Sequence, residues 1–474
     1  MSALADRNTA PSSERGDAKP QENSCWFLYF AVGGGAIGGL LYGYDTGIIS
    51  GALLQIKKDF SIGHRMQEFV TSAILAGAIA GAFIGGWLTD RLGRKHTIQI
   101  VASVYAFGAI ACSLAPDAAL LCLGRVFLGL AVGASSQTVP AYVAELAPPE
   151  RRGHFVASFN VAIGLGILAA NLVASGLGAV LSWRWMIGGA ALPATCFLVC
   201  ALYMPESPRW LVSKGRIEEA KEELASVRNP GADIGAEIGE IRDVVDAESN
   251  SSVKGWSGLT EGWVRPAIFA ALGVAAFTQL TGIEMMIYYA PTLLTAVGFS
   301  HETALRSSLW LGLVYAVMTT LGLLIVDRVG RRRLTLVMLP GAALSLIVLG
   351  FLFFAGWAQG THAWVVVSCL LSYMFFNAGG IQVVGWLLGS ETYPLSVRGA
   401  GTSAQAVTVW SADLLVTITA LTLVQALGTG GVMWVYGLMN ILAFVFVFRF
   451  LPETAGKSLE QIENTLKAGK FKPS

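Results

Sequence analysis

Apolar runs of membrane-spanning length recur along this chain and constrain its fold more than any other feature. A helix rises about 1.5 Å per residue, so about 20 apolar residues cross the hydrocarbon core of a bilayer. Only 13% of the residues are charged, whereas about a quarter are charged in a typical soluble domain. The sequence therefore predicts an all-α membrane protein with twelve transmembrane helices, at about 26–54, 68–89, 97–116, 118–143, 155–177, 184–204, 265–297, 304–326, 334–357, 363–389, 400–427 and 430–451.

The segments outside these runs divide the chain. Residues 1–24 are polar and predict a disordered tail, and residues 216–224 carry Glu and Lys three and four positions apart, in the pattern of a solvated helix. We expect five parts: a cytoplasmic N-terminal tail (1–24), a six-helix bundle (25–204), a cytoplasmic helical linker (205–264), a second six-helix bundle (265–451) and a cytoplasmic C-terminal tail (452–474).

Arginine and lysine cluster in alternate loops, which predicts the orientation of the chain. The loops after spans two, four, eight and ten carry Arg91, Arg94, Lys95, Arg151, Arg152, Arg328, Arg331, Arg332, Arg333 and Arg398. The opposite side carries Lys57, Lys58 and Arg65, and little else. Because cytoplasmic loops are enriched in Lys and Arg, we expect a multi-pass protein of the cell membrane, plasma or inner, with both termini in the cytoplasm.

The two halves of the chain repeat each other. Glu145 precedes Arg152 by seven positions, and Glu391 precedes Arg398 by the same interval, 246 positions later. Pro205-Glu206-Ser207 recurs as Pro452-Glu453-Thr454, and the segment 90–95 recurs as 327–332. Three matched loops in the same order predict a parallel repeat of two six-helix bundles, an arrangement known in secondary transporters.

One acid and one base lie inside apolar runs. Asp45 interrupts span one, and Arg125 interrupts span four about seven residues from the same side. A charge in hydrocarbon costs several kcal/mol, so Asp45 is either functional or paired. A static ion pair is one interpretation. A proton-binding site is the other, since burial favours the protonated carboxyl while a neighbouring Arg favours the ionised one.

Several classes of function are not favoured. The net charge is +1 without a basic stripe, so no nucleic-acid partner is expected. The six cysteines lack the spacing of a metal site or a disulfide framework. Neither a nucleophile with its base nor a phosphate loop is present, so we expect no catalytic residues, cofactor or metal, and the chain is expected to act as a monomer.

The motifs taken together resemble one known family. They are Gly43-Tyr44-Asp45-Thr46-Gly47, Gly86 to Lys95, Gly124-Arg125-Val126-Phe127-Leu128-Gly129, Pro140 to Glu145 with Arg152-Gly153, Pro205 to Leu211, Gln279 to Ile283, and Pro452-Glu453-Thr454 with Gly456 to Leu459. In this order they resemble the sugar porters of the major facilitator superfamily. The resemblance implies proton-coupled symport of a monosaccharide or a polyol or cyclitol by alternating access, with a sugar or polyol, a proton and the lipid bilayer as partners.

The resemblance also implies the site residues. Asp45 with Arg125 would couple transport to protons, since uniporters of the family typically lack the acid. The implied substrate site contains Tyr42, Asn160, Ile167, Gln279, Glu284, Tyr288, Trp386, Trp410 and Asp413. Amides bind hydroxyls as donor and acceptor, and aromatic rings stack on sugar C–H faces. Taken alone, either tryptophan is more typical of packing or of an interface anchor than of a substrate site.

This chain departs from the family pattern where the substrate is expected. Glu284 and Asp413 stand at positions that are Asn in the family, and Thr278 and Val383 replace a Gln and a Pro. Carboxylates bind vicinal hydroxyls, which keeps a sugar or polyol as the leading substrate class. The surplus negative charge equally suits a cationic amino sugar or other amine. An uncoupled facilitator and a non-transporting sensor of the same fold are the remaining alternatives.

Charged residues at the ends of the spans indicate a gate. The resemblance implies that an ion-pair network latches the two bundles in the outward-open state and breaks as they rock inward. Its members would be Arg91, Glu145, Arg152, Glu206, Arg209, Glu391 and Arg398. The alternative is ordinary positive-inside charge, to which Arg333 is assigned.

Overall fold

The computed structural model describes residues 23–148, 151–178, 180–250, 255–296, 298–357, 363–457 and 459–473, and these ranges contain helices and no strand. The first half forms α1 (Asn23–Asp59), α2 (His64–Leu92), α3 (Arg94–Ser113), α4 (Ala118–Leu146), α5 (Arg152–Leu177), α6 (Trp183–Gly188) and α7 (Ala191–Tyr203). The second half forms α12 (Arg265–Leu280), α13 (Ile283–Ala296), α14 (His301–Val329), α15 (Arg331–Phe354), α16 (Ala363–Gly379), α17 (Ile381–Thr392), a 3₁₀ turn (Leu395–Val397) and α18 (Arg398–Phe450).

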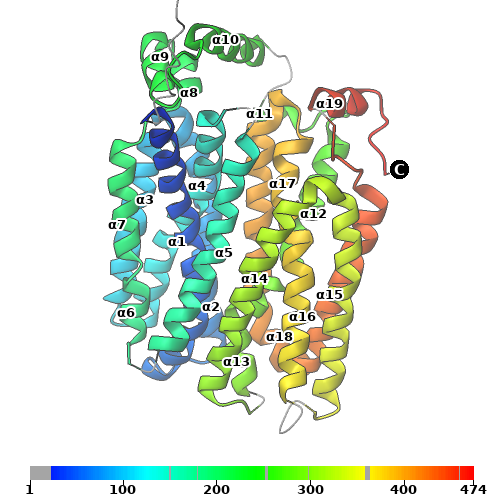
Figure 1. Ribbon diagram of the computed structural model, residues 1–474. Helices are drawn as coiled ribbons and strands as arrows, with labels where there is room; N and C mark the ends of the chain where they lie inside the picture. The colour runs from blue at the N-terminus through cyan, green and yellow to red at the C-terminus, as the bar shows by residue number, and fades with distance from the viewer. Residues whose placement is uncertain are drawn as a thin grey trace, which may run out of the picture.

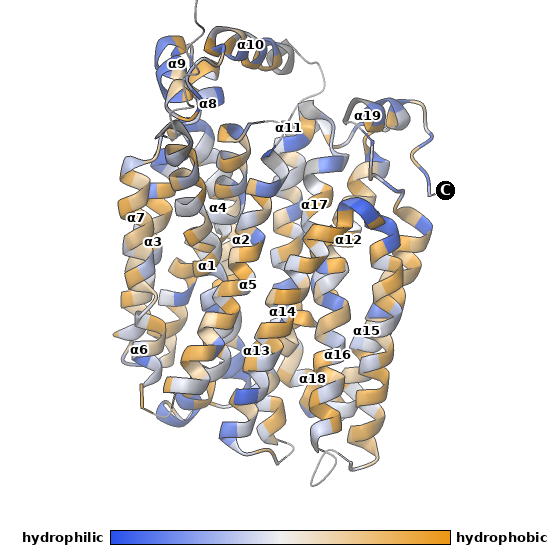
Figure 2. Cartoon of the chain, in the orientation of Figure 1, coloured by the Kyte–Doolittle hydropathy of each residue, from blue (hydrophilic) through white to orange (hydrophobic). Residues whose placement is uncertain are grey.

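Twelve apolar passes are present, as the sequence predicts. Eleven continuous segments of the described chain are long and apolar enough to cross a membrane. The last of them, α18, has 53 residues and is interrupted at Gly428, whose φ of 72° and ψ of 164° are not helical, so it contains two passes. Figure 2 shows apolar residues along the length of the bundle and hydrophilic residues concentrated toward its two ends.

Two passes of the second half are each broken into two helices, α12 with α13 and α16 with α17. The break between α12 and α13 falls at Gly282, whose φ of 93° favours glycine. The carbonyl of Thr281, which lacks a partner in its own helix at this break, accepts hydrogen bonds from Tyr373 Oη (2.9 Å) and Asn440 Nδ2 (3.1 Å). Gln382 of α17, which follows the break between α16 and α17, donates through Nε2 to the carbonyl of Thr278 near the end of α12 (2.6 Å). A broken helix survives at this depth because side chains satisfy the exposed backbone groups.

Glycine allows the helices of the first half to approach each other closely. A Cβ on Gly77 or Gly81 of α2 would collide with backbone carbonyls of α4, and a Cβ on Gly129 or Gly133 of α4 would collide with carbonyls of α2. This is the close packing through small faces that Gly-rich spans predict.

The linker helices lie at one end of the bundle. They are α8 (Pro208–Ser213), α9 (Ile217–Ser226), α10 (Ile234–Asn250) and α11 (Gly255–Gly258), and α19 (Leu459–Lys467) lies at the same end, as does the start of α1 (Figure 1). Arg228 joins the linker to the bundle: it pairs with Glu237 of α10, and its Nη1 donates to the carbonyl of Leu146 (2.7 Å) at the end of α4. We call this the linker end and the opposite one the far end. The basic residues in the loops after spans two, four, eight and ten lie at the linker end.

Candidate functional site

Asp45 of α1 and Arg125 of α4 meet inside the first half. Arg125 Nη2 lies 3.5 Å from Asp45 Oδ2, and the two residues are 0% and 3% exposed. Arg125 Nη2 also donates to the carbonyl of Thr71 (3.4 Å), whereas its Nε and Nη1 have no hydrogen-bond partner among the described residues. The structure thus brings together the acid and base that interrupt the apolar runs. Arg125 thus makes one long contact with the carboxylate of Asp45, and two of its donor nitrogens remain without a partner among the described residues.

A central cavity lies between the two halves. It holds about 450 Å³ of space not occupied by atoms, including the part open to solvent, and it is lined by Tyr42, Asn160, Ile163, Gln279, Glu284, Tyr315, Thr319, Leu323, Gln382, Val383 and Trp386. Asn160 is eight residues from the start of α5 at the linker end, and Leu323 is six from the end of α14 there. The cavity therefore occupies the linker-side part of the bundle. Its lining combines hydroxyls, amides, one carboxyl and an indole.

The cavity contains five of the nine residues expected at the substrate site, and the other four lie behind its wall. Tyr42, Asn160, Gln279, Glu284 and Trp386 line it. Ile167, Tyr288, Trp410 and Asp413 are buried and do not line it; the ring of Trp410 packs edge-on against Tyr42, with centroids 5.2 Å apart.

Three polar lining residues were missed by the sequence reasoning. They are Tyr315, Thr319 and Gln382. Gln382 precedes Trp386 by four positions, so a search for polar residues on the helical face of Trp386 would have found it. Tyr315 and Thr319 lie in an unremarkable apolar run of α14, and no local signal distinguishes them.

Two buried carboxyl groups lie on different helices of the second half. Glu284 follows the break at Gly282 in α13, and Asp413 lies in α18. Asp413 Oδ1 accepts a hydrogen bond from Thr417 Oγ1 (3.0 Å). Glu284 Oε2 has no hydrogen-bond partner among the described residues, and neither has Gln279 Oε1 nor Trp410 Nε1. Buried polar atoms are usually satisfied, so these three indicate a place for a ligand or water.

The two halves are joined at the far end. Glu68 of α2 is 3% exposed, and its carboxylate accepts hydrogen bonds from the backbone N–H (2.7 Å) and Oγ1 (2.8 Å) of Thr422 in α18. Within the second half, Tyr289 Oη of α13 donates to the carbonyl of Thr417 in α18 (3.1 Å). Hydrogen bonds to a carboxylate are among the stronger ones in proteins. The bundle is therefore closed at the far end, while its cavity lies on the linker side.

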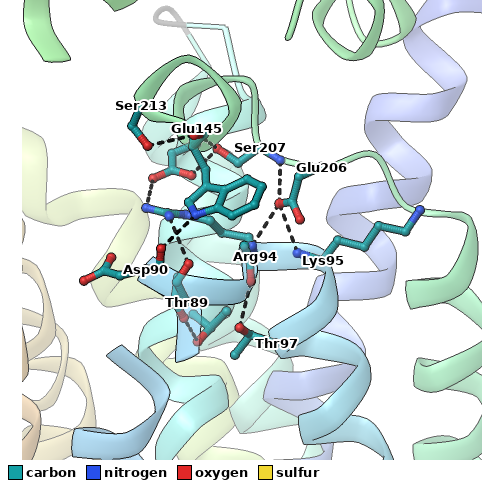
Figure 3. A network of polar contacts seen from close by, with 12 residues as sticks. Thr89, Asp90, Arg94, Lys95, Thr97, Glu145, Glu206, Ser207 and Ser213 are labelled. Carbon is teal, nitrogen blue, oxygen red and sulfur yellow. Dashed lines mark hydrogen bonds and ion pairs between the residues drawn. The ribbon is translucent and has the colours of Figure 1, made fainter. Parts of the chain in front are cut away.

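A polar network at the linker end ties α3, α4 and the start of the linker together (Figure 3). Arg94 Nη2 pairs with Glu145 Oε1 (2.9 Å), and Ser207 Oγ donates to Glu145 Oε2 (2.5 Å). Glu206 Oε1 accepts from the backbone N–H groups of Arg94 (2.8 Å), Lys95 (3.2 Å) and Ser207 (2.8 Å). A carboxylate at the start of α3 satisfies free N–H groups and complements the helix dipole.

The second half repeats this network. Arg331 pairs with Glu391 (2.5 Å), and Thr454 Oγ1 donates to Glu391 Oε2 (3.1 Å). Glu453 accepts from the backbone N–H groups at the start of α15, with 2.8 Å to that of Arg331. Gly330, like Gly93 in the first half, has a positive φ, and a Cβ on either would collide with the capping carboxylate. The sequence repeat is therefore a repeat of one helix-capping device.

The described partners of the two acids are arginines at the starts of neighbouring helices. The described partner of Glu145 is Arg94 and that of Glu391 is Arg331, because each of these arginines starts a helix beside the acid, whereas Arg398 contacts the carbonyl of Tyr393. Arg91 lies over the ring of Trp87, with its Cζ 4.3 Å from the centroid. The side chain of Arg152 lies outside the described residues. The contacts described for Glu145, Glu206 and Glu391 each stay within one half.

The described part of the chain contains no group of three or more His, Cys, Asp and Glu side chains placed to hold a metal ion.

Comparisons with known proteins agree with this architecture. The family described as "Sugar (and other) transporter" matches residues 34–466. A D-xylose transporter of Levilactobacillus brevis is 37% identical over 448 residues, which cover 94% of this chain and 96% of the relative. The major myo-inositol transporter IolT of Bacillus subtilis (strain 168) is 35% identical over 457 residues, covering 94% and 96%.

Solved structures of the xylose transporter XylE from E. coli are also similar. Its partially occluded inward-open conformation has a TM-score of 0.80 at 27% identity and covers 91% of this chain and 100% of that one. A second structure, described as a proton:xylose symporter bound to 6-bromo-6-deoxy-D-glucose, has a TM-score of 0.78 at 27% identity and covers 94% and 100%.

Proposed function

Because the chain belongs to the sugar transporter family of the major facilitator superfamily, we propose that it couples the entry of a neutral monosaccharide or polyol to that of protons. It is a multi-pass membrane transporter and not an enzyme. The observation that carries the coupling is the buried contact between Asp45 and Arg125. A carboxyl at this depth needs either a partner or a proton, and Asp45 has a partner that can hold it or release it.

In the coupling step, Arg125 and a proton compete for the carboxylate of Asp45. When Asp45 is ionised, it attracts Arg125 and holds α1 against α4 in the position described. When Asp45 takes up a proton, that attraction is lost, and Arg125 retains its contact to the carbonyl of Thr71. Because α1 also supplies Tyr42 to the cavity, a movement of α1 changes the substrate site. A proton can thus bias the two-state equilibrium on which transport depends.

The lining of the cavity suits a neutral polyhydroxylated ligand. Asn160, Gln279 and Gln382 supply amides, Tyr42 and Tyr315 supply phenols, and Trp386 supplies an aromatic face. Relatives are named for D-xylose and for myo-inositol, one a monosaccharide and the other a cyclitol. We infer a substrate of this size and polarity, and we assign the substrate-binding role to the five expected residues on the cavity wall.

The structure corresponds to one conformational state of the alternating-access cycle. We propose that the linker end faces the cytoplasm, because its loops carry most of the loop arginines and lysines. The state described, closed at the far end with a cavity on the linker side, is then inward-facing. The two termini would lie in the cytoplasm, and one chain would form the whole pathway.

A second candidate substrate class is supported by the unpartnered carboxyl Glu284. A cationic amino sugar or amine would pair with it, and Asp413 is a second buried carboxyl of the same half. The two substrate classes predict different results: a transporter of neutral sugars accumulates a neutral sugar, and a transporter of amines does not.

Uptake into proteoliposomes tests the proposal, with D-xylose, myo-inositol, D-glucose and the amino sugar D-glucosamine as labelled probes. With an inside-negative potential of 100 mV, one proton carried per sugar permits about 50-fold accumulation. We expect Asp45→Asn to reduce this ratio to about one, while exchange of labelled for unlabelled sugar continues.

The matched control is Asp59→Asn, at the far end of the same helix, where Asp59 pairs with Arg184 at the surface. It should accumulate sugar as the wild type does. Accumulation of sugar by Asp45→Asn at the wild-type level and with the wild-type pH dependence would show that Asp45 is not the coupling site.

A further inference from the structure

Gln279 and Glu284 stand on the two sides of the helix break at Gly282, and both line the cavity. A continuous α-helix turns about 100° per residue, so two side chains five positions apart would point about 140° away from each other. Each of the two also has a buried oxygen without a partner among the described residues, Oε1 of Gln279 and Oε2 of Glu284. The geometry of the break therefore decides which polar atoms a substrate meets.

Side chains outside the cavity hold this break. In an uninterrupted helix the carbonyl of Thr281 would accept from the backbone N–H of Met285, but the described backbone hydrogen bonds do not include this one. The carbonyl accepts from Tyr373 Oη of α16 (2.9 Å) and Asn440 Nδ2 of α18 (3.1 Å), and Asn377 Nδ2 of α16 donates to Thr281 Oγ1 (3.0 Å). Tyr373, Asn377 and Asn440 are each 0% exposed and do not line the cavity. We call these three residues the break clamp.

The orientation of both amides in the break clamp follows from their partners. The nitrogen of Asn440 lies beside two carbonyls, that of Thr281 and that of Tyr436 (2.8 Å), and a carbonyl only accepts. Thr281 Oγ1 donates its own hydrogen to the carbonyl of Thr278 (3.1 Å), so it accepts from Asn377. All three residues of the break clamp therefore act as donors to the end of α12, and an apolar substitution removes that donor.

Gly282 makes the break possible. Its φ of 93° is strained for a residue with a side chain, and a Cβ there would lie 2.6 Å from ring atoms of Tyr436. An alanine at this position would favour a straight helix, in which the Thr281 carbonyl returns to the N–H of Met285.

We propose that Tyr373, Asn377 and Asn440 are positioning residues for the substrate. By occupying Thr281 they keep α12 and α13 as two separate helices, and so direct Gln279 and Glu284 into one cavity. This inference rests on the proposed transport through that cavity. It assigns part of the substrate affinity to side chains that do not line the cavity.

Transport kinetics in proteoliposomes test the proposal. Tyr373→Phe and Asn440→Leu each leave the Thr281 carbonyl one donor, whereas the double variant leaves none, so the two effects should not add. The KM for whichever of D-xylose, myo-inositol, D-glucose and D-glucosamine is transported should rise by less than about threefold in each single variant. It should rise by about tenfold or more in the double variant, because the hydrogen bonds of two cavity residues are lost.

The split between KM and Vmax separates positioning from a loss of folded protein. Fewer folded molecules lower Vmax and leave KM unchanged, whereas we expect Vmax of the double variant to stay within about twofold. Asn440→Leu also removes a buried oxygen, Oδ1, that has no partner among the described residues. Gly282→Ala should raise KM as the double variant does. The matched control is Trp434→Phe, which removes an indole donor from the carbonyl of Ile347 (3.1 Å) between α18 and α15 and should leave KM unchanged.

Spin labels measure the break without any substrate. Phe269→Cys of α12 and Ala296→Cys of α13 are at exposed positions, and in a background without the native cysteines they report the distance across Gly282. A straight helix would place these two positions about 40 Å apart. The distance should lengthen toward this value in the double variant and stay at the wild-type value in Trp434→Phe.

An unchanged label distance in the double variant overturns the break clamp, and a lengthened distance with an unchanged KM overturns its role in positioning. Absence of neutral-sugar accumulation by the wild type contradicts the proposed symport alone. The label distance can still be measured in that case, and the KM for D-glucosamine takes the place of that for a sugar, so the two proposals fail separately.

Discussion

At the scale of single residues, Glu284 and Asp413 distinguish a neutral substrate from a cationic one. Changing either to Asn restores the amide that is usual in the family and retains hydrogen-bonding capacity toward hydroxyls. We therefore expect Glu284→Asn and Asp413→Asn to retain uptake of a neutral sugar within about tenfold of the wild-type rate. If the pair binds a cation, leaving that charge unpaired costs about 3–5 kcal/mol, and uptake should fall by more than 100-fold.

Labelled uptake at matched membrane abundance measures the difference. Loss of all uptake in both variants, with a wild type that accepts only amines, would contradict the sugar proposal. Asn160→Asp, which adds a carboxyl on the opposite wall of the cavity, provides the reverse comparison, since it should favour an amine over a sugar.

Glu223 of the linker helix α9 is expected to make stability depend on pH. It lies half-buried at the linker end, where burial raises the pKa of its carboxyl above its ordinary value of about 4.5, although the backbone N–H of Glu206 and the charge of Lys95 oppose this. A raised pKa in the folded state means that the contribution to stability is present below about pH 4.5 and is lost as pH rises through the folded pKa.

Glu223→Gln should therefore raise the melting temperature at neutral pH and have no effect at acid pH, with the difference disappearing as pH falls through the folded pKa. Thermal unfolding of detergent-solubilised protein checks this, and the exposed Glu222→Gln is the control. A difference that grows toward acid pH would contradict the assigned direction.

The sequence predicts functional residues where a charge interrupts an apolar run, and less where the residue is merely polar. Asp45 and Arg125 are conspicuous because charges in hydrocarbon are costly, and the structure places them in contact. Glu68 lies at the first turn of a span and resembles ordinary loop charge, yet its carboxylate is buried and joins the two halves. Only the packing of α2 against α18 reveals that role.

At the scale of elements, the number of spans was predictable, but their breaks were not. Apolar length identifies a pass, whereas the end of a helix within it depends on which side chain can satisfy the freed carbonyl. Gly282 ends α12 because Tyr373 and Asn440, far away in the sequence, reach the carbonyl of Thr281. The partners of Glu145 and Glu391 were not predictable for a similar reason, since spacing along the chain does not show which helix start lies beside each acid.

The contact between α2 and α18 predicts a conformational effect. Glu68→Ala removes the acceptor of two hydrogen bonds across the far end, each worth about 1.5–3 kcal/mol when the acceptor is charged. We expect the ratio of far-end-closed to far-end-open molecules to fall by at least tenfold. Hydrogen–deuterium exchange should increase in residues 64–72 and 418–427.

Increased exchange at the far end has two possible explanations, a shift between two states and a local loosening. They predict different exchange at the linker end. Opening of the far end should close the linker end, so exchange around Asn160 and Trp386 should decrease in Glu68→Ala. If exchange increases at the far end but does not decrease near the cavity, Glu68 stabilises the far end only locally. Glu302→Ala, an exposed acid at the far end, should change neither.

At the scale of the whole molecule, transport requires the two ends to open in turn, and each end has its own carboxylates. At the far end, Glu68 joins the halves in the state described. At the linker end, Glu145 and Glu391 are each satisfied within their own half. A network that latches the halves in the other state needs only to bias an equilibrium, and a few kcal/mol suffice.

Glu391→Gln should weaken the linker-end latch and shift the resting population toward the inward-open state, opposite to the effect of Glu68→Ala. The two sites lie at opposite ends and share no partner, so their free-energy changes should add, and the double variant should return toward the wild-type population. Spin labels on Gly153→Cys and Gly399→Cys, one in each half at exposed positions with open space around them, can report the linker-end distance in a background without the native cysteines. We expect longer distances in Glu391→Gln, shorter ones in Glu68→Ala and an intermediate distribution in the double variant. An unchanged distribution in Glu391→Gln would mean that this acid serves only to hold Arg331, at the start of α15, and Thr454, after the end of α18.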